Sequence, residues 1–156
     1  VRTKPWTLAS AEIAASGAAA AMQPNFDLLW GGESGFYVRK LGLPRYLQMN
    51  RFHSLTQAGV RVCGGSDWYI TALDAALSIR AAMQHKNPLE RLNHSEAIAS
   101  YTSNAAGLSR EENTRGKLAE GYVADFSVYD KPLDAPQVKP GLKAVICKGE
   151  MGYERV

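Results

Sequence analysis

The chain has 156 residues, of which 46% are hydrophobic and 21% charged, a composition typical of one soluble globular domain and not of a disordered segment. Its 18 basic and 15 acidic residues give a net charge of +3, and the basic residues are scattered along the chain. This excludes the basic stripe of a nucleic-acid-binding protein. No run of about 18 strongly apolar residues is present to span a membrane. We therefore expect a cytoplasmic protein with neither nucleic-acid nor membrane partners.

The two cysteines, Cys63 and Cys147, each lie in a short apolar run. We expect both to be buried, reduced strand residues, and a disulfide between them is the alternative. No CxxC pair or Cys/His cluster is present, so a structural zinc site is not predicted. The chain begins with Val1 rather than Met, which we interpret as a sign that it is a piece of a longer protein.

The N-terminal half is predicted to alternate helices and strands. A helix ends at Ser16, before Gly17, and residues 18–22 form a strand that stops before Pro24. Residues 25–42 carry several glycines among aromatic side chains, which favours a long loop. Residues 44–58 then form a helix with proline in its first turn. A short strand over residues 60–64 ends in a Gly-Gly-Ser-Asp-Trp turn.

Two further helices and a β-rich tail complete the predicted order. Residues 71–84 form a helix that begins with a capping box of Thr71 and Asp74. Residues 93–106 form another, capped by Asn93 with Glu96 reaching back and stopped by Gly107. From residue 115 onward, glycines separate short strand-like runs at residues 117–119, 126–129, 144–147 and 151–154.

This alternation predicts an α/β fold with a parallel sheet, in which chemistry gathers at the carboxyl ends of the strands. Asp67 directly follows the strand at residues 60–64. It is therefore the candidate catalytic residue.

The segment from Gly59 to Trp68, GVRVCGGSDW, resembles the last barrel strand of the amidohydrolase superfamily. Following the Asn-Ala-Ala at residues 104–106, residues 115–130 (RGKLAEGYVADFSVYD) resemble the signature that leads into the small β domain of these enzymes. The Met-Gln-Pro at residues 22–24 and the Gly-Ser-Asp-Trp turn together point to the amidohydrolase 3 branch. That branch includes YtcJ-like proteins and relatives of the N-acyl-D-amino-acid deacylases. The resemblance runs from about residue 8 to the end of the chain.

The resemblance implies that residues 1–110 form the C-terminal part of a (β/α)8 TIM barrel, namely its last two strands and their helices. Residues 111–156 would then be the β-rich tail, part of a small composite β-sandwich. The implied function is a metal-dependent hydrolase of carbon–nitrogen bonds in small amide-type substrates, with a divalent metal that we expect to be zinc. Of the family's metal ligands, only the aspartate of the eighth strand has a match here, Asp67. We therefore expect an incomplete active site, and a chain that alone binds no zinc tightly, hydrolyses no amide and self-associates.

Asp67 is expected to bind the metal and to act as a general base, with a helix-cap or turn role as the alternative. Gln23, at the end of the preceding strand, could face the substrate, or be only a polar strand end. Arg45 and Arg51 could bind a substrate carboxylate, although a solvated helix face explains both. Trp68 could form a wall of the substrate pocket, with packing as the alternative.

The remaining candidates have simple structural explanations. Trp30 could also wall a pocket or simply pack. His53, His85 and His94 lie in helices or their flanks, so we interpret them as surface or packing residues rather than metal ligands. Two other functions stay open. One is a non-catalytic structural or assembly fragment, and the other is a different α/β hydrolase with Asp67 as nucleophile, which would need a partner acid or base.

Overall fold

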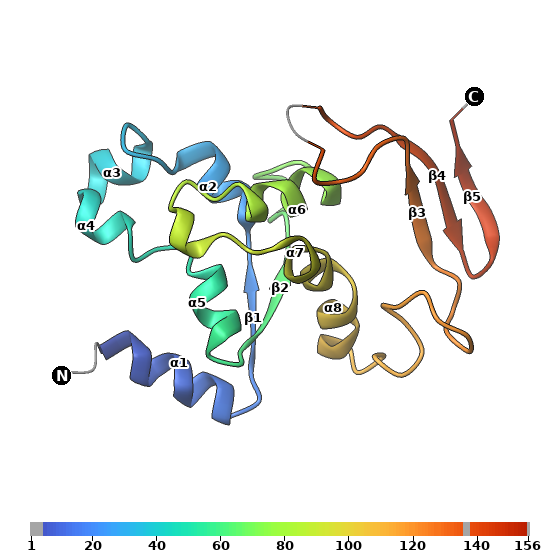
Figure 1. Cartoon of the computed structure of the whole chain (residues 1–156), viewed down its shortest axis with the longest axis horizontal. Helices are drawn as coiled ribbons and strands as arrows, with labels where there is room; N and C mark the ends of the chain where they lie inside the picture. The colour runs from blue at the N-terminus through green and yellow to red at the C-terminus, as the bar shows by residue number, and fades with distance from the viewer. Residues whose placement is uncertain (1–4, 136–137, 156) are drawn as a thin grey trace.

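Two short parallel strands form the centre of the molecule. The computed structural model describes residues 5–135 and 138–155. Strand β1 (Ala19–Met22) pairs in parallel with β2 (Arg61–Gly64), and Met22 stands opposite Gly64. Figure 1 shows the two strands side by side, with helices around them and a separate sheet toward the C-terminus. Because parallel neighbours need a crossover connection, the chain passes through helices between the two strands.

The helices that surround the strand pair are mostly short. In chain order they are α1 (Pro5–Ala15), α2 (Pro24–Trp30), α3 (Phe36–Leu41), α4 (Leu43–Tyr46), α5 (Phe52–Gln57), α6 (Ala75–Met83), the 3-10 helix η1 (Pro88–Glu90), α7 (His94–Tyr101) and α8 (Ser103–Leu108). Asp74 caps α6 by accepting the N–H of Leu77 at 2.9 Å. Asn93 and Glu96 cap α7 reciprocally, with both hydrogen bonds at 2.9 Å. No helix in the described ranges is long and apolar enough to cross a bilayer.

The hydrophobic core lies between β2 and the helices that pack on it. Its buried apolar side chains are Phe52, Val62, Ile79, Ala82, Leu92 and Ala97. Ile79 and Ala82 are about one helical turn apart, so α6 turns an apolar face toward this cluster. Leu133, from the tail, packs against the same cluster. This core therefore supports the end of β2 from which Asp67 follows.

The C-terminal tail forms a three-stranded antiparallel sheet. Strand β3 (Phe126–Tyr129) pairs with β4 (Leu142–Cys147), which pairs with β5 (Glu150–Glu154). Lys148 and Gly149 connect β4 to β5 with φ values of 53° and 83°, the left-handed backbone that tight hairpin turns require. Every residue of β5 is exposed.

One arginine ties the tail to the helical part of the chain. The guanidinium Nη1 of Arg80, on α6, donates hydrogen bonds to three tail carbonyls, those of Val138 at 2.6 Å, Ala135 at 2.9 Å and Leu133 at 3.5 Å. Beside it, Lys139 Nζ lies 3.0 Å from Asp74 Oδ2. The tail therefore packs against α6 through a charged side chain and main-chain oxygens.

The strand predictions are largely confirmed. The strands expected at residues 18–22, 60–64 and 126–129 are present to within a residue. The last two tail strands are also present and begin earlier than predicted. The run at residues 117–119 forms no strand. Both cysteines are free, but only Cys63 is buried, because Cys147 lies at the exposed end of β4.

The helix predictions are wrong in several boundaries. Residues 25–42 are not a long loop but contain α2 and α3, each too short to show a helical apolar stripe. The helix predicted over residues 44–58 is broken, because Asn50 takes a left-handed φ of 48° between α4 and α5. The helix predicted over residues 93–106 breaks at Thr102, so Gly107 lies inside α8. The cap of α6 is Asp74 alone, and Thr71 precedes the helix.

Candidate functional site

The carboxyl ends of β1 and β2 bring two segments of the candidate site together. Because Met22 stands opposite Gly64, Gln23 and Gly65 leave the sheet at the same edge. The N–H of Gly65 donates to the carbonyl of Met22 at 2.8 Å, which extends the pairing beyond β2. The Gln23 Nε2 atom lies 4.0 Å from the point where a Cβ on Gly65 would stand. The side chain of Gln23 therefore lies beside the turn that carries Asp67.

Asp67 lies in this turn with its side chain exposed. Its backbone is left-handed, with φ at 51°, a conformation that aspartate tolerates better than most residues. The N–H of Ile70 donates to the Asp67 carbonyl at 2.7 Å and closes the turn. Asp67 is not the cap of α6, because Asp74 has that role. No side chain in the described part of the chain pairs with the Asp67 carboxylate, so its oxygens are available to an external ligand.

Two hydroxyl groups hold the residues that precede Asp67. The hydroxyl of Thr71, a buried residue, donates to the carbonyl of Ser66. The hydroxyl of Tyr101, on α7, donates to the carbonyl of Gly65 at 3.3 Å. The path of the chain into Asp67 is therefore fixed from two sides.

The predicted substrate-binding residues fall in different places. Gln23 is at the carboxyl edge, and Trp68 follows Asp67 with 64% of its surface exposed. Arg45, in contrast, lies exposed on α4, which packs on α3 at the flank of the molecule (Figure 1). The break at Asn50 separates α4 from the helix that leads into β2. The structure therefore brings Gln23 and Trp68 to Asp67 but does not bring Arg45 there.

Two further candidates are occupied by other contacts. Arg51 Nη2 donates to Ser54 Oγ at 2.8 Å and lies 3.5 Å from Glu90 Oε1, so it joins α5 to η1. Trp30 packs among aromatic rings, with centroids 4.7 Å from Phe26 and 6.1 Å from Tyr37. Packing is therefore the better explanation for Trp30, and a structural ion pair for Arg51.

A buried polar cluster that the sequence did not indicate holds α2, α4 and the segment after α6 together. Asp27, which is 0% exposed, accepts hydrogen bonds from the Tyr46 hydroxyl at 2.9 Å and the Lys86 N–H at 2.7 Å. His85 Nε2 lies 3.5 Å from Asp27 Oδ1. Burial lowers the pKa of His85 although Asp27 opposes the effect, and burial together with Asp27 raises the pKa of Tyr46 to about 12. This cluster is a structural device rather than an open site.

The described residues do not assemble a metal site on their own. Nowhere in them do three or more His, Cys, Asp or Glu side chains gather closely enough to hold a metal ion. His85 is buried, His53 faces Glu96 at 3.8 Å and His94 faces Asp134 at 3.0 Å, as expected of packing and surface residues. Asp67 fits one ligand position of a divalent cation, and one carboxylate is too few to hold it.

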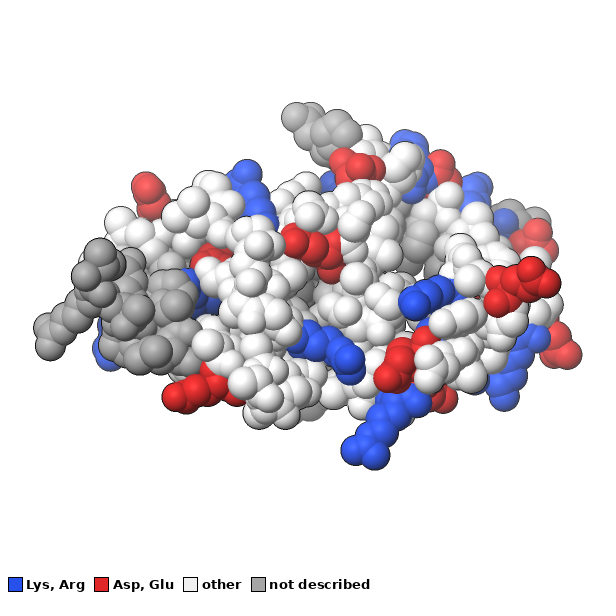
Figure 2. Space-filling model, turned by 60° about the horizontal axis from the view of Figure 1, so that its bottom comes forward, with Lys and Arg blue, Asp and Glu red and all other residues white. Residues whose placement is uncertain are grey.

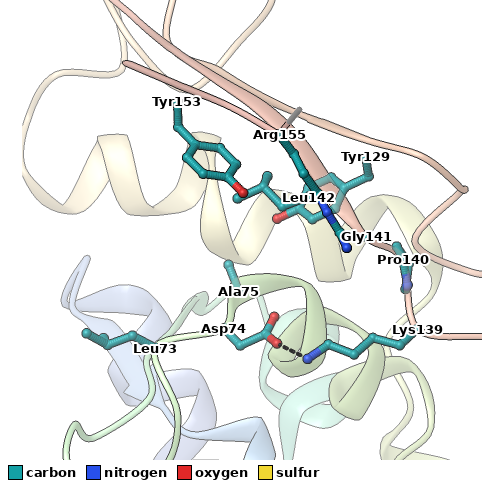
Figure 3. A pocket seen from close by; sticks show the side chains of 10 residues that line it. All are labelled: Leu73, Asp74, Ala75, Tyr129, Lys139, Pro140, Gly141, Leu142, Tyr153 and Arg155. Carbon is teal, nitrogen blue, oxygen red and sulfur yellow. Dashed lines mark ion pairs between the residues drawn. The ribbon is translucent and has the colours of Figure 1, made fainter. Parts of the chain in front are cut away.

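A cavity of about 690 Å³ lies between the start of α6 and the tail sheet. Figure 3 shows the paired Asp74 and Lys139 on one side, with Tyr129, Tyr153 and Arg155 on the other. The remaining lining residues are Leu73, Ala75, Pro140, Gly141 and Leu142. Asp67 is not among them, so this cavity belongs to the joint between the helical part and the tail.

Charged side chains are mixed on the molecular surface. On the face presented in Figure 2, basic and acidic groups alternate around broad uncharged areas, and neither sign forms a continuous field. On this face the basic side chains are therefore interspersed with acidic ones and do not form a stripe.

The sequence matches the model of the amidohydrolase family over residues 9–153. It is 31% identical over 151 residues to YtcJ of Bacillus subtilis (strain 168), a candidate amidohydrolase by its name. The match covers 86% of this chain and 27% of that protein. It is also 34% identical over 118 residues to an imidazolonepropionase of Acinetobacter baumannii (strain ATCC 17978), covering 76% of this chain and 26% of that protein. The chain belongs to the amidohydrolase family, and it spans 27% and 26% of the length of these two relatives.

Solved structures share the fold. An amidohydrolase from Thermotoga maritima MSB8 superposes with a TM-score of 0.71 at 17% identity, over 96% of this chain and 35% of that chain. An uncharacterized metal-dependent hydrolase from Pyrococcus furiosus superposes with a TM-score of 0.61 at 24% identity, over 72% of this chain and 23% of that chain. The α/β arrangement with a small antiparallel sheet is therefore one found in amidohydrolase structures.

Proposed function

We propose that this chain supplies Asp67 as the catalytic aspartate of a metal-dependent hydrolase that cleaves carbon–nitrogen bonds in non-peptide amides. The observation that carries the proposal is the position of Asp67, exposed and just beyond the carboxyl end of β2. Parallel α/β folds concentrate their chemistry at this edge. Membership of the amidohydrolase family supports the reaction class.

In this proposal Asp67 moves the proton of the attacking water. Its carboxylate takes a proton as the water oxygen bonds to the amide carbonyl carbon, and returns it to the nitrogen as the C–N bond breaks, leaving a carboxylic acid and an amine. A divalent metal, zinc in our proposal, would lower the pKa of such a water toward neutrality. Gln23 and Trp68 would contact the substrate beside Asp67. Arg45 has no part in the proposal, because it lies on the flank.

We further propose that β1 and β2 are the last two strands of a (β/α)8 barrel, within a barrel portion at residues 1–110. Residues 111–156 would be the β-sandwich portion. The parallel pairing of β1 with β2 and the separate antiparallel tail support this division. The other metal ligands would come from polypeptide outside these 156 residues, because the relatives are much longer than the chain. Two unpaired cysteines are compatible with a cytoplasmic location.

The test uses the product of the gene that encodes this chain, at its native length. Metal content is measured by mass spectrometry, and hydrolysis is assayed on a panel of N-acylated amino acids. We expect Asp67→Asn to lower kcat/KM by about 10²- to 10⁴-fold and to reduce bound metal, with an unchanged circular dichroism spectrum. Asp134→Asn, at an exposed tail carboxylate, is the matched control. An Asp67→Asn protein with the metal content and activity of the wild type would refute the proposal.

A non-catalytic assembly role is the second candidate, favoured by the single carboxylate and by an exposed apolar segment. The exposed side chains of that segment are Trp68, Tyr69, Ile70 and Leu73. Such a surface favours association with another polypeptide or a second copy. This role predicts a native-length product without bound metal and without hydrolytic activity. The third possibility, Asp67 as nucleophile, has no support, because no acid or base among the described residues contacts it.

A further inference from the structure

The turn that carries Asp67 is held by contacts that the proposed chemistry does not use. Thr71 and Tyr101 donate to the carbonyls of Ser66 and Gly65, the two residues immediately before Asp67. A hydrogen bond to a carbonyl fixes the plane of the peptide that contains it. Fixing both planes sets the direction in which the Asp67 side chain leaves the turn.

A buried asparagine fixes the threonine in turn. Asn25, which is 1% exposed, donates through Nδ2 to Thr71 Oγ1 at 3.2 Å and to Ser78 Oγ at 2.9 Å. A hydroxyl has a single proton, and Thr71 uses it on Ser66 while its oxygen accepts from Asn25. The hydrogen bonds therefore run in one direction, from Asn25 through Thr71 to the turn, and such chains polarise one another.

This chain of hydrogen bonds also couples the two strands at the carboxyl edge. Asn25 is the second residue of α2, shortly after the end of β1 at Met22, whereas Ser66 follows β2. The contacts therefore fix the turn of one strand relative to the end of its neighbour. A substrate held between Gln23 and Asp67 would meet two groups whose separation is set by buried side chains.

We propose that Thr71 is a positioning residue for Asp67, supported by Asn25 and Tyr101. The inference rests on the proposed function of Asp67. Thr71 touches neither substrate nor reacting atoms, and it acts through the Ser66 carbonyl. Holding a reacting group in its productive geometry contributes to rate rather than to binding. Loss of the Thr71 hydroxyl should therefore lower kcat and leave KM nearly unchanged.

The experiment compares variants of the native-length gene product. Thr71→Val keeps the side-chain volume and removes the hydroxyl, and we expect kcat to fall about 10- to 100-fold with KM changed less than about twofold. Thr71→Ser restores the hydroxyl and should recover most of the rate. Thr56→Val is the matched control, because Thr56 donates to Phe52 within α5 at 2.9 Å, away from the turn. Tyr101→Phe, which keeps the ring, supplies a second variant if Thr71→Val folds poorly, with an expected loss in kcat of about 3- to 10-fold.

A second readout does not depend on activity. The N–H of Ile70 closes the turn on the Asp67 carbonyl at 2.7 Å, so its hydrogen exchange reports the order of the turn. We expect exchange about tenfold faster in Thr71→Val and unchanged in Thr56→Val. The positioning role would be overturned if both Thr71→Val and Tyr101→Phe had the kcat and the Ile70 amide exchange of the wild type. If Asp67→Asn were inactive in the same assays, the proposed function would still stand. A fully active Asp67→Asn protein would refute both the proposed function and the positioning role.

Discussion

The ring of Tyr101 lies directly against the α-carbon of Gly64. A Cβ atom placed on this glycine would stand 2.0 Å from Tyr101 Cε2 and 2.3 Å from Cζ, far inside van der Waals contact. The end of β2 and the face of α7 are therefore in contact through a position that only glycine can occupy. The same tyrosine holds the next carbonyl of the chain, that of Gly65.

Gly64→Ala should therefore destabilise the protein by about 2–3 kcal/mol, because the tyrosine ring or the strand must move to admit a methyl group. Urea unfolding followed by circular dichroism measures the change. Gly65→Ala is the matched control, since nothing lies closer than 4.0 Å to its added Cβ. A double variant with Tyr101→Ala should recover part of the loss as a coupling energy. Equal stability of the two alanine variants would contradict the contact.

His85 should make the stability depend on pH. Burial holds the pKa of His85 below its ordinary value of 6.5 in the folded chain, so the unfolded chain binds this proton first as the pH falls. The free energy of unfolding should be level above about pH 6.5 and decline below it, by at most about 1.4 kcal/mol per pH unit. Denaturant titrations at several pH values should show that the free energy of unfolding of His85→Gln depends less steeply on pH than that of the wild type.

Asp74 should contribute more to stability than its salt-bridge partner. Burial alone would raise the pKa of Asp74, but the Leu77 N–H and Lys139 lower it overall. Asp74→Ala should cost about 1–2 kcal/mol through loss of the helix cap, whereas Lys139→Ala, at a side chain 74% exposed, should cost less than about 1 kcal/mol.

The cap and the charge of Asp74 can be separated by substitution. Asp74→Ser keeps a capping oxygen and should behave like Lys139→Ala. Because the folded pKa is lowered, the contribution of the Asp74 charge should be present above the ordinary value of 3.8 and lost as the pH falls below it. Thermal unfolding of Asp74→Ala, Asp74→Ser and Lys139→Ala measures their loss of stability, which we expect to be largest for Asp74→Ala. A larger loss in Lys139→Ala than in Asp74→Ala would contradict the prediction.

Arg80→Ala should loosen the tail. Removing a guanidinium that serves three carbonyls should cost about 2–3 kcal/mol and speed amide exchange over residues 138–142, while α7 stays protected. Arg80→Lys, which keeps the charge but has a different length and donor geometry, should fall between the wild type and alanine. If amide hydrogen exchange in the tail were the same in Arg80→Ala as in the wild type, other contacts would hold the sheet in place.

The isolated 156-residue chain should bind zinc only weakly, because a single carboxylate does not hold the ion. A titration at micromolar protein should therefore show no stoichiometric end point. Isothermal titration of the wild type, Asp67→Asn and Cys147→Ser checks this, and the last variant removes an exposed thiol that could bind zinc nonspecifically. Tight stoichiometric binding that Asp67→Asn abolishes would show that the chain carries a complete site.

Much of the fold could be predicted because strong local signals mark it. An apolar run between Gly17 and Pro24 predicted β1, and a run that stops at Gly64 predicted β2. The Asn93 and Glu96 pair predicted the start of α7. The helices α2 and α3 were missed because each is shorter than two turns and shows no apolar period. The breaks at Asn50 and Thr102 depend on backbone angles that the tertiary structure imposes on residues otherwise compatible with a helix.

The sequence indicated the positions of Asp67, Trp68 and Gln23 because each follows the end of a strand that a local pattern marks. Asp67 and Trp68 share the turn after β2, and Gln23 follows β1. The Asn25 contacts to Thr71 and Ser78 join positions 46 and 53 residues apart. No pattern in one sequence pairs such distant polar residues, and the same holds for Asp27 with His85.

Within the described part of the tail, Arg80 donates its hydrogen bonds to main-chain oxygens, those of Leu133, Ala135 and Val138. Exchanging the side chains of Ala135 or Val138 for others leaves those oxygens in place, so the tail can change its sequence there without losing its attachment. For these three hydrogen bonds, the side-chain requirement falls on position 80 alone. A mutation at position 80 affects all three hydrogen bonds. Substitutions at Ala135 or Val138 leave these bonds in place as long as the backbone follows the same path.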